Sequence, residues 1–245
     1  MSVSVKNFSK KYKNFPAVSD VSFECGEGRI TGILGPNGAG KTTILKAISA
    51  RHIPTSGDIF VDGKSVLDET ESVRNLTGFV TEEPELPLEY KVFEYLDSVL
   101  QLHSPQNPAV KKKLEQELYE NLSLKELMNK KIKRLSKGQR QRVNFAQALI
   151  FSPSVLILDE PASGLDPSQI IKMRSFVKSL RKNRTIIIST HIMQEAQALC
   201  DDILILSHGK IAASGTVSQI TGATNSKSLE EAFFRLTQTD QEVKS

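Results

Sequence analysis

Residues 30–43 read ITGILGPNGAGKTT, and this stretch decides the fold. Its first five residues form an apolar run of strand length, and apolar residues return at helical spacing from Ile44 onward. A strand therefore leads into a glycine-rich loop, and the loop opens a helix. This order predicts a cradle for phosphate, because glycines let the loop wrap closely around an anion and turn its backbone N–H groups inward.

The cradle predicts roles for individual residues. The helix that starts near Lys41 adds the partial positive charge of its N-terminus. We expect the Lys41 ammonium to reach the β- and γ-phosphates of a nucleotide and the Thr42 hydroxyl to bind Mg²⁺. A loop that uses glycine only for turns is the alternative, and the position between a strand and a helix disfavours it. The predicted nucleotide-binding loop comprises Gly35, Pro36, Asn37, Gly38, Ala39, Gly40, Lys41, Thr42 and Thr43.

A second apolar run, residues 155–158, ends in two acids, Asp159 and Glu160. Buried parallel strands have such continuous runs, and ligands of open α/β sheets bind beyond the carboxyl ends of the strands. In a chain with a phosphate loop, this arrangement indicates Asp159 for Mg²⁺ and Glu160 for polarising a water molecule. Either carboxylate could instead cap a helix or form a salt bridge.

Two further side chains are candidates for the same site. His191 follows the apolar strand predicted at residues 185–190, so we expect it at the same sheet edge and near the γ-phosphate; a purely structural histidine is the alternative. Tyr12 has basic neighbours and lies upstream of the glycine-rich loop. It could stack on an adenine face or be a half-exposed tyrosine at a strand end, and the residues alone do not decide.

The helix predicted over residues 135–149 begins with serine and glycine. Ser136 is in the N-cap position and Gly138 is in the first turn. This helix N-terminus could therefore face a phosphate, whereas an ordinary capped helix is the alternative.

The rest of the chain alternates between strands and helices, except for one insert. Strands are predicted at residues 3–8, 21–25 and 77–80, with a hairpin turning at Asp62-Gly63. From residue 84 to 134 there is little strand signal. Apolar residues recur there at helical spacing, in one set with Val92, Leu96 and Leu100 and in a second set with Val110, Leu114 and Leu118.

Composition limits the function classes. The 245 residues are 39% hydrophobic and 24% charged, as in ordinary globular proteins, and the net charge of +4 is too mild to indicate nucleic-acid binding. No run approaches the ~18 apolar residues of a membrane span. The N-terminus has no apolar segment of the kind found in signal peptides, so we expect neither a leader nor a membrane helix.

Taken in order, these motifs resemble those of the nucleotide-binding subunit of an ATP-binding cassette (ABC) transporter. The resemblance covers nearly the whole chain, and the helical insert lies where that family has one. The matching elements are Walker A at Gly35–Thr43, the signature at Leu135–Gln139, Walker B at Leu156–Glu160, the D-loop at Ser163–Asp166, the switch histidine His191 and the adenine-stacking aromatic Tyr12.

The resemblance implies an α/β fold organised as one ABC ATPase domain, residues 1–245. Its P-loop NTPase (RecA-like) core and antiparallel β subdomain would span residues 1–83 and 151–225. A helical subdomain with the signature would occupy residues 84–150, and a C-terminal helix and tail would occupy residues 226–245.

The resemblance also implies the composition of the site. Two cassettes would pack head to tail around two ATP molecules, with Ser136, Gly138 and Gln139 acting on the nucleotide of the partner. Glu160, His191 and Lys41 would carry hydrolysis, and Thr42, Asp159 and Glu82 would hold Mg²⁺. The partners would be a second nucleotide-binding subunit and transmembrane permease subunits, which would place the chain at the cytoplasmic face of the cell (inner) membrane.

Two residues depart from the family pattern. Lys137 replaces the first glycine of the signature, which leaves Ser136 and Gly138 for the phosphate. Glu82 stands where the family usually has the glutamine of its Q-loop. A carboxylate can still reach Mg²⁺, but it adds negative charge and cannot donate a hydrogen bond as an amide does.

The stretch Leu229–Thr237 resembles the tail of ABC-2 type exporter subunits, and the long regulatory domain of many importer ATPases is not seen. Importers of branched-chain amino acids have similarly short cassettes and are an alternative. A soluble cassette protein without a permease is another. A P-loop GTPase is disfavoured, because no Asn-Lys-x-Asp segment is found.

Overall fold

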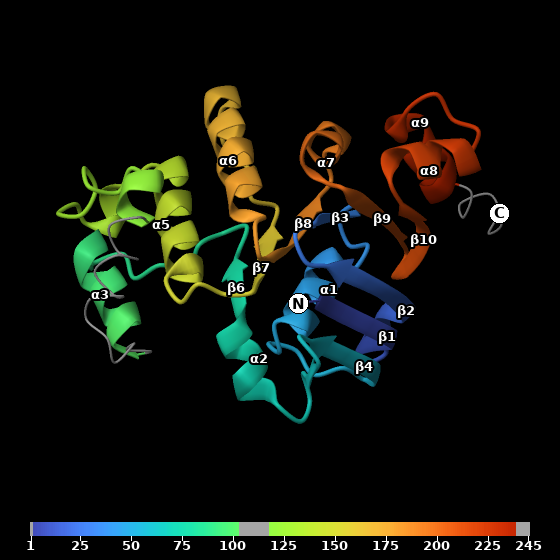
Figure 1. Cartoon of the computed structure of the whole chain (residues 1–245), viewed down its shortest axis with the longest axis horizontal. Helices are drawn as coiled ribbons and strands as arrows, with labels where there is room; N and C mark the ends of the chain where they lie inside the picture. The colour runs from blue at the N-terminus through green and yellow to red at the C-terminus, as the bar shows by residue number, and fades with distance from the viewer. Residues whose placement is uncertain (1, 103–117, 239–245) are drawn as a thin grey trace.

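The computed structural model describes residues 2–102 and 118–238, and a six-stranded sheet runs through its centre (Figure 1). The strand order is β10-β9-β3-β8-β7-β6, with all neighbours parallel except the antiparallel pair β9–β10. The central strands have the predicted continuous apolar runs. The strands are β3 (Ile30–Leu34), β6 (Thr77–Val80), β7 (Val155–Asp159), β8 (Thr185–Thr190), β9 (Asp202–Ser207) and β10 (Lys210–Gly215).

A second, antiparallel sheet has the order β2-β1-β4-β5 and comprises β1 (Ser2–Tyr12), β2 (Phe15–Gly26), β4 (Ser56–Val61) and β5 (Lys64–Ser65). The hairpin at Asp62-Gly63 is confirmed. The strands predicted at residues 3–8 and 21–25 are only parts of β1 and β2. Irregularities interrupt the β1–β2 pairing between Val5 and Lys11, so the alternation of polar and apolar residues is lost although the pairing continues.

Helices cover the sheets and form the insert: α1 (Lys41–Ile48), α2 (Thr70–Leu76), α3 (Val92–Leu102), α5 (Lys137–Leu149), α6 (Pro167–Leu180), α7 (Met193–Leu199), α8 (Val217–Ala223) and α9 (Leu229–Gln238), with a 3-10 turn at Ile132–Arg134. The sequence does not predict α2, α7 and α8, which have seven residues each and are too short for a periodic pattern. The predicted helix with Val110 and Leu114 and the tail after residue 238 lie outside the described residues.

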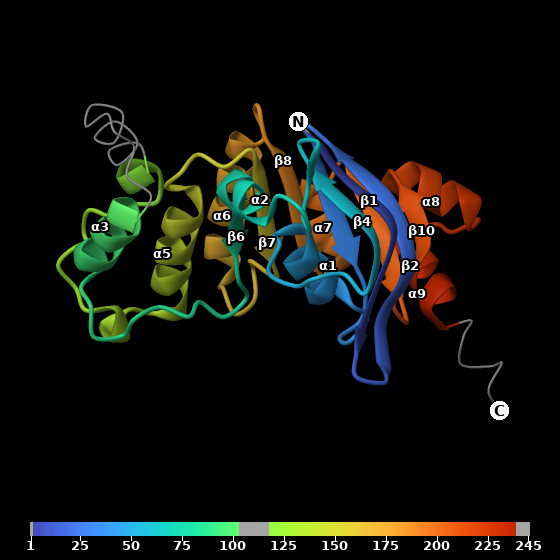
Figure 2. The ribbon, with the colours of Figure 1, turned by 90° about the horizontal axis from the view of Figure 1, so that it is seen from below.

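Alternate residues of the central strands enter two different cores. Leu156 and Leu158 of β7 pack in the same core as α5 and α6, whereas Val155 and Ile157 pack with α1 and the antiparallel sheet. The six-stranded sheet is therefore covered on both faces, as Figure 2 shows from a second direction. The helical part with α3 and α5 lies at one end of the molecule, and α8 and α9 lie at the other (Figure 1).

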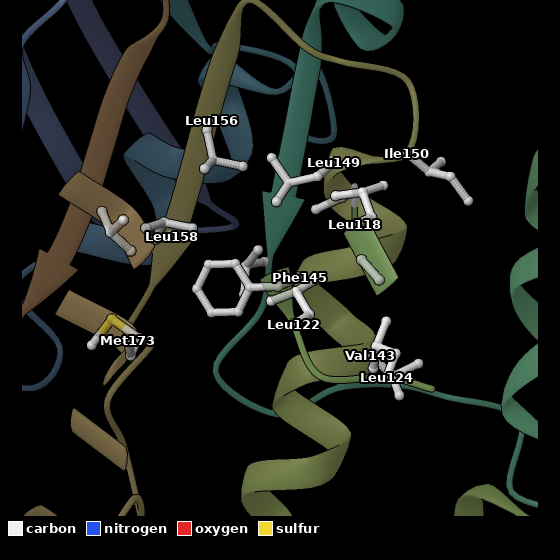
Figure 3. Close-up of a cluster of buried hydrophobic side chains, with 14 of the residues drawn as sticks. Leu118, Leu122, Leu124, Val143, Phe145, Leu149, Ile150, Leu156, Leu158 and Met173 are labelled. Atoms are coloured by element: carbon white, nitrogen blue, oxygen red, sulfur yellow. The ribbon is translucent and has the colours of Figure 1, made fainter. Parts of the chain in front are cut away.

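The helical part is joined to the sheet through α5. Figure 3 shows the side chains of α5 between those of β7 and those of residues 118–124. Phe145 is 3% exposed, and its ring meets Phe176 of α6 edge to face at a centroid distance of 5.7 Å. The segment that carries the predicted signature is thus fixed to the sheet by continuous apolar packing.

Gly78 of β6 provides a test of this junction. A Cβ atom there would lie 2.3 Å from the Ala148 carbonyl oxygen of α5, so Gly78→Ala must move backbone. We expect a loss of about 1–3 kcal/mol in the free energy of unfolding, measured by denaturant titration. The matched control is Gly222→Ala in α8, where a Cβ meets nothing within 4 Å. The control should be neutral or stabilising, and an equal loss in both variants would contradict the packing described here.

Candidate active site

The glycine-rich loop between β3 and α1 is held tightly by its surroundings. Gly40 has a φ of 106°, and a Cβ there would lie 2.7 Å from the Ala17 carbonyl oxygen. A Cβ at Gly35 would lie 2.6 Å from the Leu206 carbonyl oxygen. The first turn of α1 has neither a side-chain cap nor an acidic residue. Its N–H groups therefore have no competing side chain within the turn, which suits them to an anion.

The Lys41 side chain lies inside this loop and is buried. Its Nζ donates hydrogen bonds to the carbonyl oxygens of Gly35 at 2.9 Å and Pro36 at 3.3 Å. The same ammonium is 3.3 Å from Oε1 of Glu160, whose side chain is only 10% exposed. The structure therefore brings the predicted phosphate-binding cation and the predicted water-polarising carboxylate into contact.

Glu160 has an uncommon backbone conformation. Its φ is 45°, in the left-handed region that residues other than glycine rarely adopt. The Glu160 N–H donates to the hydroxyl of Ser189 at 3.0 Å, and Nδ1 of His191 lies 2.9 Å from Glu160 Oε2. The carboxylate thus bridges Lys41 on one side and His191 on the other, and the half-exposed His191 ring sits at the rim.

Ser189 is a site residue that the sequence reading does not identify. Its hydroxyl donates to Oδ1 of Asp159 at 2.6 Å and fixes that carboxylate at the end of β7. The signal was present in the sequence, because Ser189 and Thr190 are polar residues at the end of an apolar strand. In the structure, Ser189 and Thr190 lie beside the end of β7. The sequence pattern of one strand does not reveal which strand lies next to it.

Lys41, Glu160 and His191 line one cavity of about 460 Å³, whereas Asp159 and Ser189 do not line it. It unites segments that lie far apart along the chain, from the tip of the β1–β2 hairpin to the residue after β8. The predicted residues that line it are Tyr12, Asn37, Gly38, Gly40, Lys41, Thr42, Thr43, Glu82, Glu160 and His191, joined by Phe15 and Ala17.

Two aromatic residues stand at the entrance of this cavity. The Tyr12 hydroxyl and Nδ1 of His52 share a hydrogen bond of 2.6 Å, and Lys10 Nζ lies 5.3 Å from the centroid of the Tyr12 ring. Burial, helped by nearby lysines, lowers the pKa of His52, which favours the neutral imidazole. Phe15 pairs with Tyr12 across the hairpin and is 64% exposed. The sequence reading missed Phe15, because it lies between the expected strands at residues 3–8 and 21–25.

Glu82 follows β6 and faces the same cavity. Its Oε1 accepts a hydrogen bond from the Ser163 hydroxyl at 3.1 Å, which connects the loop after β6 to the loop after Glu160. Among residues 2–102 and 118–238, no cluster of three His, Cys, Asp or Glu side chains is placed to hold a metal ion. A cation here would instead combine Thr42, Asp159 or Glu82 with phosphate oxygens, a ligand set that suits Mg²⁺.

The predicted signature residues lie elsewhere on the molecule. Ser136 caps α5, since its hydroxyl accepts from the Gln139 N–H at 3.3 Å while Gln139 Oε1 accepts from the Ser136 N–H at 3.1 Å. Ser136, Gly138 and Gln139 line a separate cavity of about 520 Å³ between α5 and α6. They do not line the cavity around Lys41. Within one chain, the structure does not bring these residues to the glycine-rich loop.

The lysine that interrupts the signature lies over the D-loop. A Cβ at Gly164 would lie 2.4 Å from Lys137 Nζ, so the Lys137 side chain crosses close above that residue. Gly164 has a φ of 69°, which suits glycine for a second reason. Lys137 therefore points across its own chain at the start of α5 and leaves Ser136 uncovered.

The class of P-loop nucleoside triphosphatases is defined by these features: a strand, a glycine-rich loop with a buried lysine, and a second strand of the same parallel sheet that ends in acids. The chain belongs to the ABC transporter family, since the model described as "ABC transporter" matches residues 18–163. It is the ATP-binding subunit type of that family and an ATPase. Within the described residues, no helix has the length and apolarity needed to cross a membrane.

Several relatives support this assignment. The ABC transporter ATP-binding protein NatA of Bacillus subtilis is 34% identical over 231 residues, which cover 94% of each chain. The lipopolysaccharide export system ATP-binding protein LptB of Haemophilus influenzae is 31% identical, with 89% of this chain and 92% of that protein covered. The sulfate/thiosulfate import protein CysA of Synechocystis is 34% identical, with 90% and 62% covered. The relatives thus include both import and export proteins.

Solved structures agree with the fold. The ATP-binding subunit of an ABC transporter superposes with a TM-score of 0.89 at 29% identity, covering 96% of this chain and 99% of that one. The cassette MJ0796, solved as a dimer in a post-hydrolysis state with ADP and Pi, has a TM-score of 0.79 at 27% identity. That alignment covers 87% of this chain and 98% of the cassette.

Glu160→Gln tests the bridging carboxylate. Glutamine keeps the shape but cannot take a proton from water, so we expect ATP turnover to fall by about a hundredfold or more. Nucleotide affinity should be kept or raised, because Lys41 loses a competing anion. Turnover is measured by phosphate release and affinity by a fluorescent ATP analogue. Glu24→Gln on the exposed face of β2 is the control, and unchanged turnover in Glu160→Gln would remove that residue from its role.

Proposed function

We propose that this chain is the ATPase engine of an ABC-2 type exporter, working at the cytoplasmic face of the cell membrane with permease subunits. ATP closes two cassettes on each other, and hydrolysis releases them. The observation that carries the proposal is the separation of two half-sites. The loop cavity holds Lys41, Glu160 and His191, whereas Ser136, Gly138 and Gln139 line another cavity.

A half-site without a signature needs a second chain to complete it. In a head-to-tail pair, the N-terminus of α5 from one cassette covers the γ-phosphate held by the other, and Ser136 and Gly138 contact that phosphate. The dimeric structures of the similar cassette MJ0796 support this arrangement. The second cassette is a copy of this chain or a paralogue, and no nucleic acid takes part.

Hydrolysis in this site relies on positioning and charge, as in other phosphoryl transfers. The loop amides and Lys41 hold the β- and γ-phosphates, and the aromatic ring of Tyr12 supports the adenine. Glu160 orients the attacking water and accepts its proton, while His191 holds Glu160 and reaches the γ-phosphate. The 2.9 Å contact between Glu160 and His191 and the 3.3 Å contact with Lys41 support these roles.

Thr42, Asp159 and Glu82 are the residues that would hold Mg²⁺, directly or through water. When bound, the ion would supply positive charge that neutralises the phosphate oxygens. The hydroxyl of Ser189 restrains Asp159, and that of Ser163 restrains Glu82, so each carboxylate is held before the metal enters.

The helical part transmits closure to the permease. A groove of about 870 Å³ lies where this part meets the core, so a permease segment seated there would contact both at once. The loop of Glu82 follows β6, which forms part of the groove wall. The residues that line the groove include Arg51, Arg74, Phe79, Val99, Gln147 and Phe151.

Export is favoured by the last part of the chain. Leu229 and Ala232, within the exporter-like stretch 229–237, are fully buried where α9 packs against the sheet. The aligned region also covers 92% of the export subunit LptB. Import is the second candidate because the import protein CysA is 34% identical, against 31% for LptB. Co-purification of the membrane subunit, followed by transport assays in inside-out and right-side-out vesicles, separates the two directions.

The shared site is tested by mixing two inactive chains. Ser136→Arg blocks the signature, and Glu160→Gln blocks the water site, so each variant alone should have almost no turnover. A mixed dimer contains one intact site, built from Glu160 of the first chain and Ser136 of the second. Equal amounts should therefore recover about a quarter of the wild-type rate if the chains pair at random.

The control for this mixture is Ser179→Arg, an exposed serine near the end of α6, which should stay active alone. Nucleotide binding by each variant is measured in parallel to show that both chains fold. Full activity of Ser136→Arg alone, or no recovery in the mixture although the variants form mixed dimers, would contradict the composite site.

Glu82→Gln tests the predicted metal contact. An amide is a weaker ligand for Mg²⁺ than a carboxylate, so the Mg²⁺ concentration for half-maximal turnover should rise by up to about tenfold, equivalent to ~1.4 kcal/mol. Glu83→Gln, next in the chain and also exposed, is the control and should not shift the Mg²⁺ dependence. An identical Mg²⁺ dependence in Glu82→Gln and wild type would remove Glu82 from the metal site.

A further inference from the structure

A buried carboxylate lies behind the site and takes no part in the roles assigned above. Glu195 is in the first turn of α7, which begins two residues after His191, and it is only 2% exposed. It does not line the cavity around Lys41. Burying a carboxylate costs free energy unless it has partners, so its contacts indicate its purpose.

Its hydrogen bond is to Thr190, which precedes His191, and Thr190 in turn contacts Ile192, which follows His191. The Thr190 hydroxyl donates to Glu195 Oε2 at 3.2 Å, and the same hydroxyl oxygen accepts the Ile192 N–H at 3.0 Å. A hydroxyl has one proton, so its donation to Glu195 leaves its lone pairs facing Ile192. Glu195 therefore fixes the orientation of the hydroxyl, and the hydroxyl fixes the backbone on both sides of His191.

The His191 turn needs such support. The His191 side chain is 50% exposed, so packing restrains it little, yet its Nδ1 must stay 2.9 Å from Glu160 Oε2. The ring can keep this distance only if the backbone that carries it is held in place. The restraint therefore has to come from the turn itself, where Thr190 and Ile192 are tied to Glu195.

The Glu195 carboxylate accepts a hydrogen bond through one of its two oxygens only, within the described part of the chain. Burial raises the pKa of Glu195, while the hydrogen bond from Thr190 and the charge of Arg174 act in the opposite direction. Its second oxygen, Oε1, and the Nε of Arg174 are buried without a hydrogen-bond partner within the described part of the chain. Of the two carboxylate oxygens, Oε2 is therefore the one that connects Glu195, through Thr190, to the His191 turn.

We propose that Glu195 is a positioning residue for ATP hydrolysis, which acts through Thr190 to hold the His191 turn and, through it, the water-orienting carboxylate of Glu160. This inference rests on the roles proposed for His191 and Glu160. It requires only that Glu195 accept a hydrogen bond, because the contact to Thr190 is made by one oxygen and glutamine offers the same acceptor.

The first test compares substitutions of Glu195 and Thr190. Glu195→Ala removes the acceptor and should lower kcat by about tenfold to a hundredfold, the scale of a misplaced catalytic group, with KM for ATP nearly unchanged. Glu195→Gln keeps the acceptor and should restore most of kcat. Thr190→Val should reproduce the loss without touching Glu195, and Thr190→Ser should restore it. Gln197→Ala, exposed on the same helix, is the control.

A double-mutant cycle with His191→Ala separates positioning from general destabilisation. Once the imidazole is gone, Glu195→Ala should cause no further loss of kcat, whereas a structural defect would lower kcat by the same factor in both backgrounds. Melting temperatures are recorded for every variant. Equal factors in the two backgrounds, or wild-type kcat in both Glu195→Ala and Thr190→Val, would overturn the inference. Loss of activity in His191→Ala with wild-type activity in Glu195→Ala would overturn this inference alone, whereas full activity in His191→Ala would contradict the proposed function.

Discussion

The contact between Lys41 and Glu160 is the interaction on which the rest of the structure depends. Both groups are largely buried, and a buried charge is tolerated only when it is paired and hydrogen-bonded. The carbonyl oxygens of Gly35 and Pro36 complete the shell of the ammonium. Because Lys41 follows β3 and Glu160 follows β7, this contact requires β8 to lie between those strands in one register. The parallel sheet and the site are therefore specified together.

The position of β8 also explains why the site is assembled from so many segments. Ser189 at its end bonds both Asp159 and the Glu160 N–H, and the next two residues carry the Thr190 hydroxyl and the His191 ring. In contrast, α5 lies at one end of the molecule (Figure 1), with Phe145 of its apolar face in the core and Ser136 at its N-terminus. The end of β8 thus contacts the acids of the site, whereas the N-terminus of α5 carries the signature residues at a separate cavity.

The sequence predicted those parts of the fold that depend on local pattern. The apolar runs of β3, β7 and β8 and the N-cap at Ser136 are visible in any short window of residues. The full length of β1 and β2 was not predicted, because irregular pairing interrupts their alternation of polar and apolar residues. Phe15 was missed for this reason. The acids and histidine of the cleft were predicted from strand ends, but Ser189 and Glu195 were not. Their roles follow from contacts between neighbouring elements, which a linear pattern does not contain.

The Lys41–Glu160 contact has a consequence for how the nucleotide enters. An incoming phosphate does not find a bare cation; it finds one already matched with a carboxylate and two carbonyl oxygens. Binding of a triphosphate would then exchange one anion, the Glu160 carboxylate, for another at the Lys41 ammonium. The same exchange liberates Glu160 only when a phosphate has taken its place. In the proposed mechanism, Glu160 would therefore become available to the attacking water only after a phosphate has bound to Lys41.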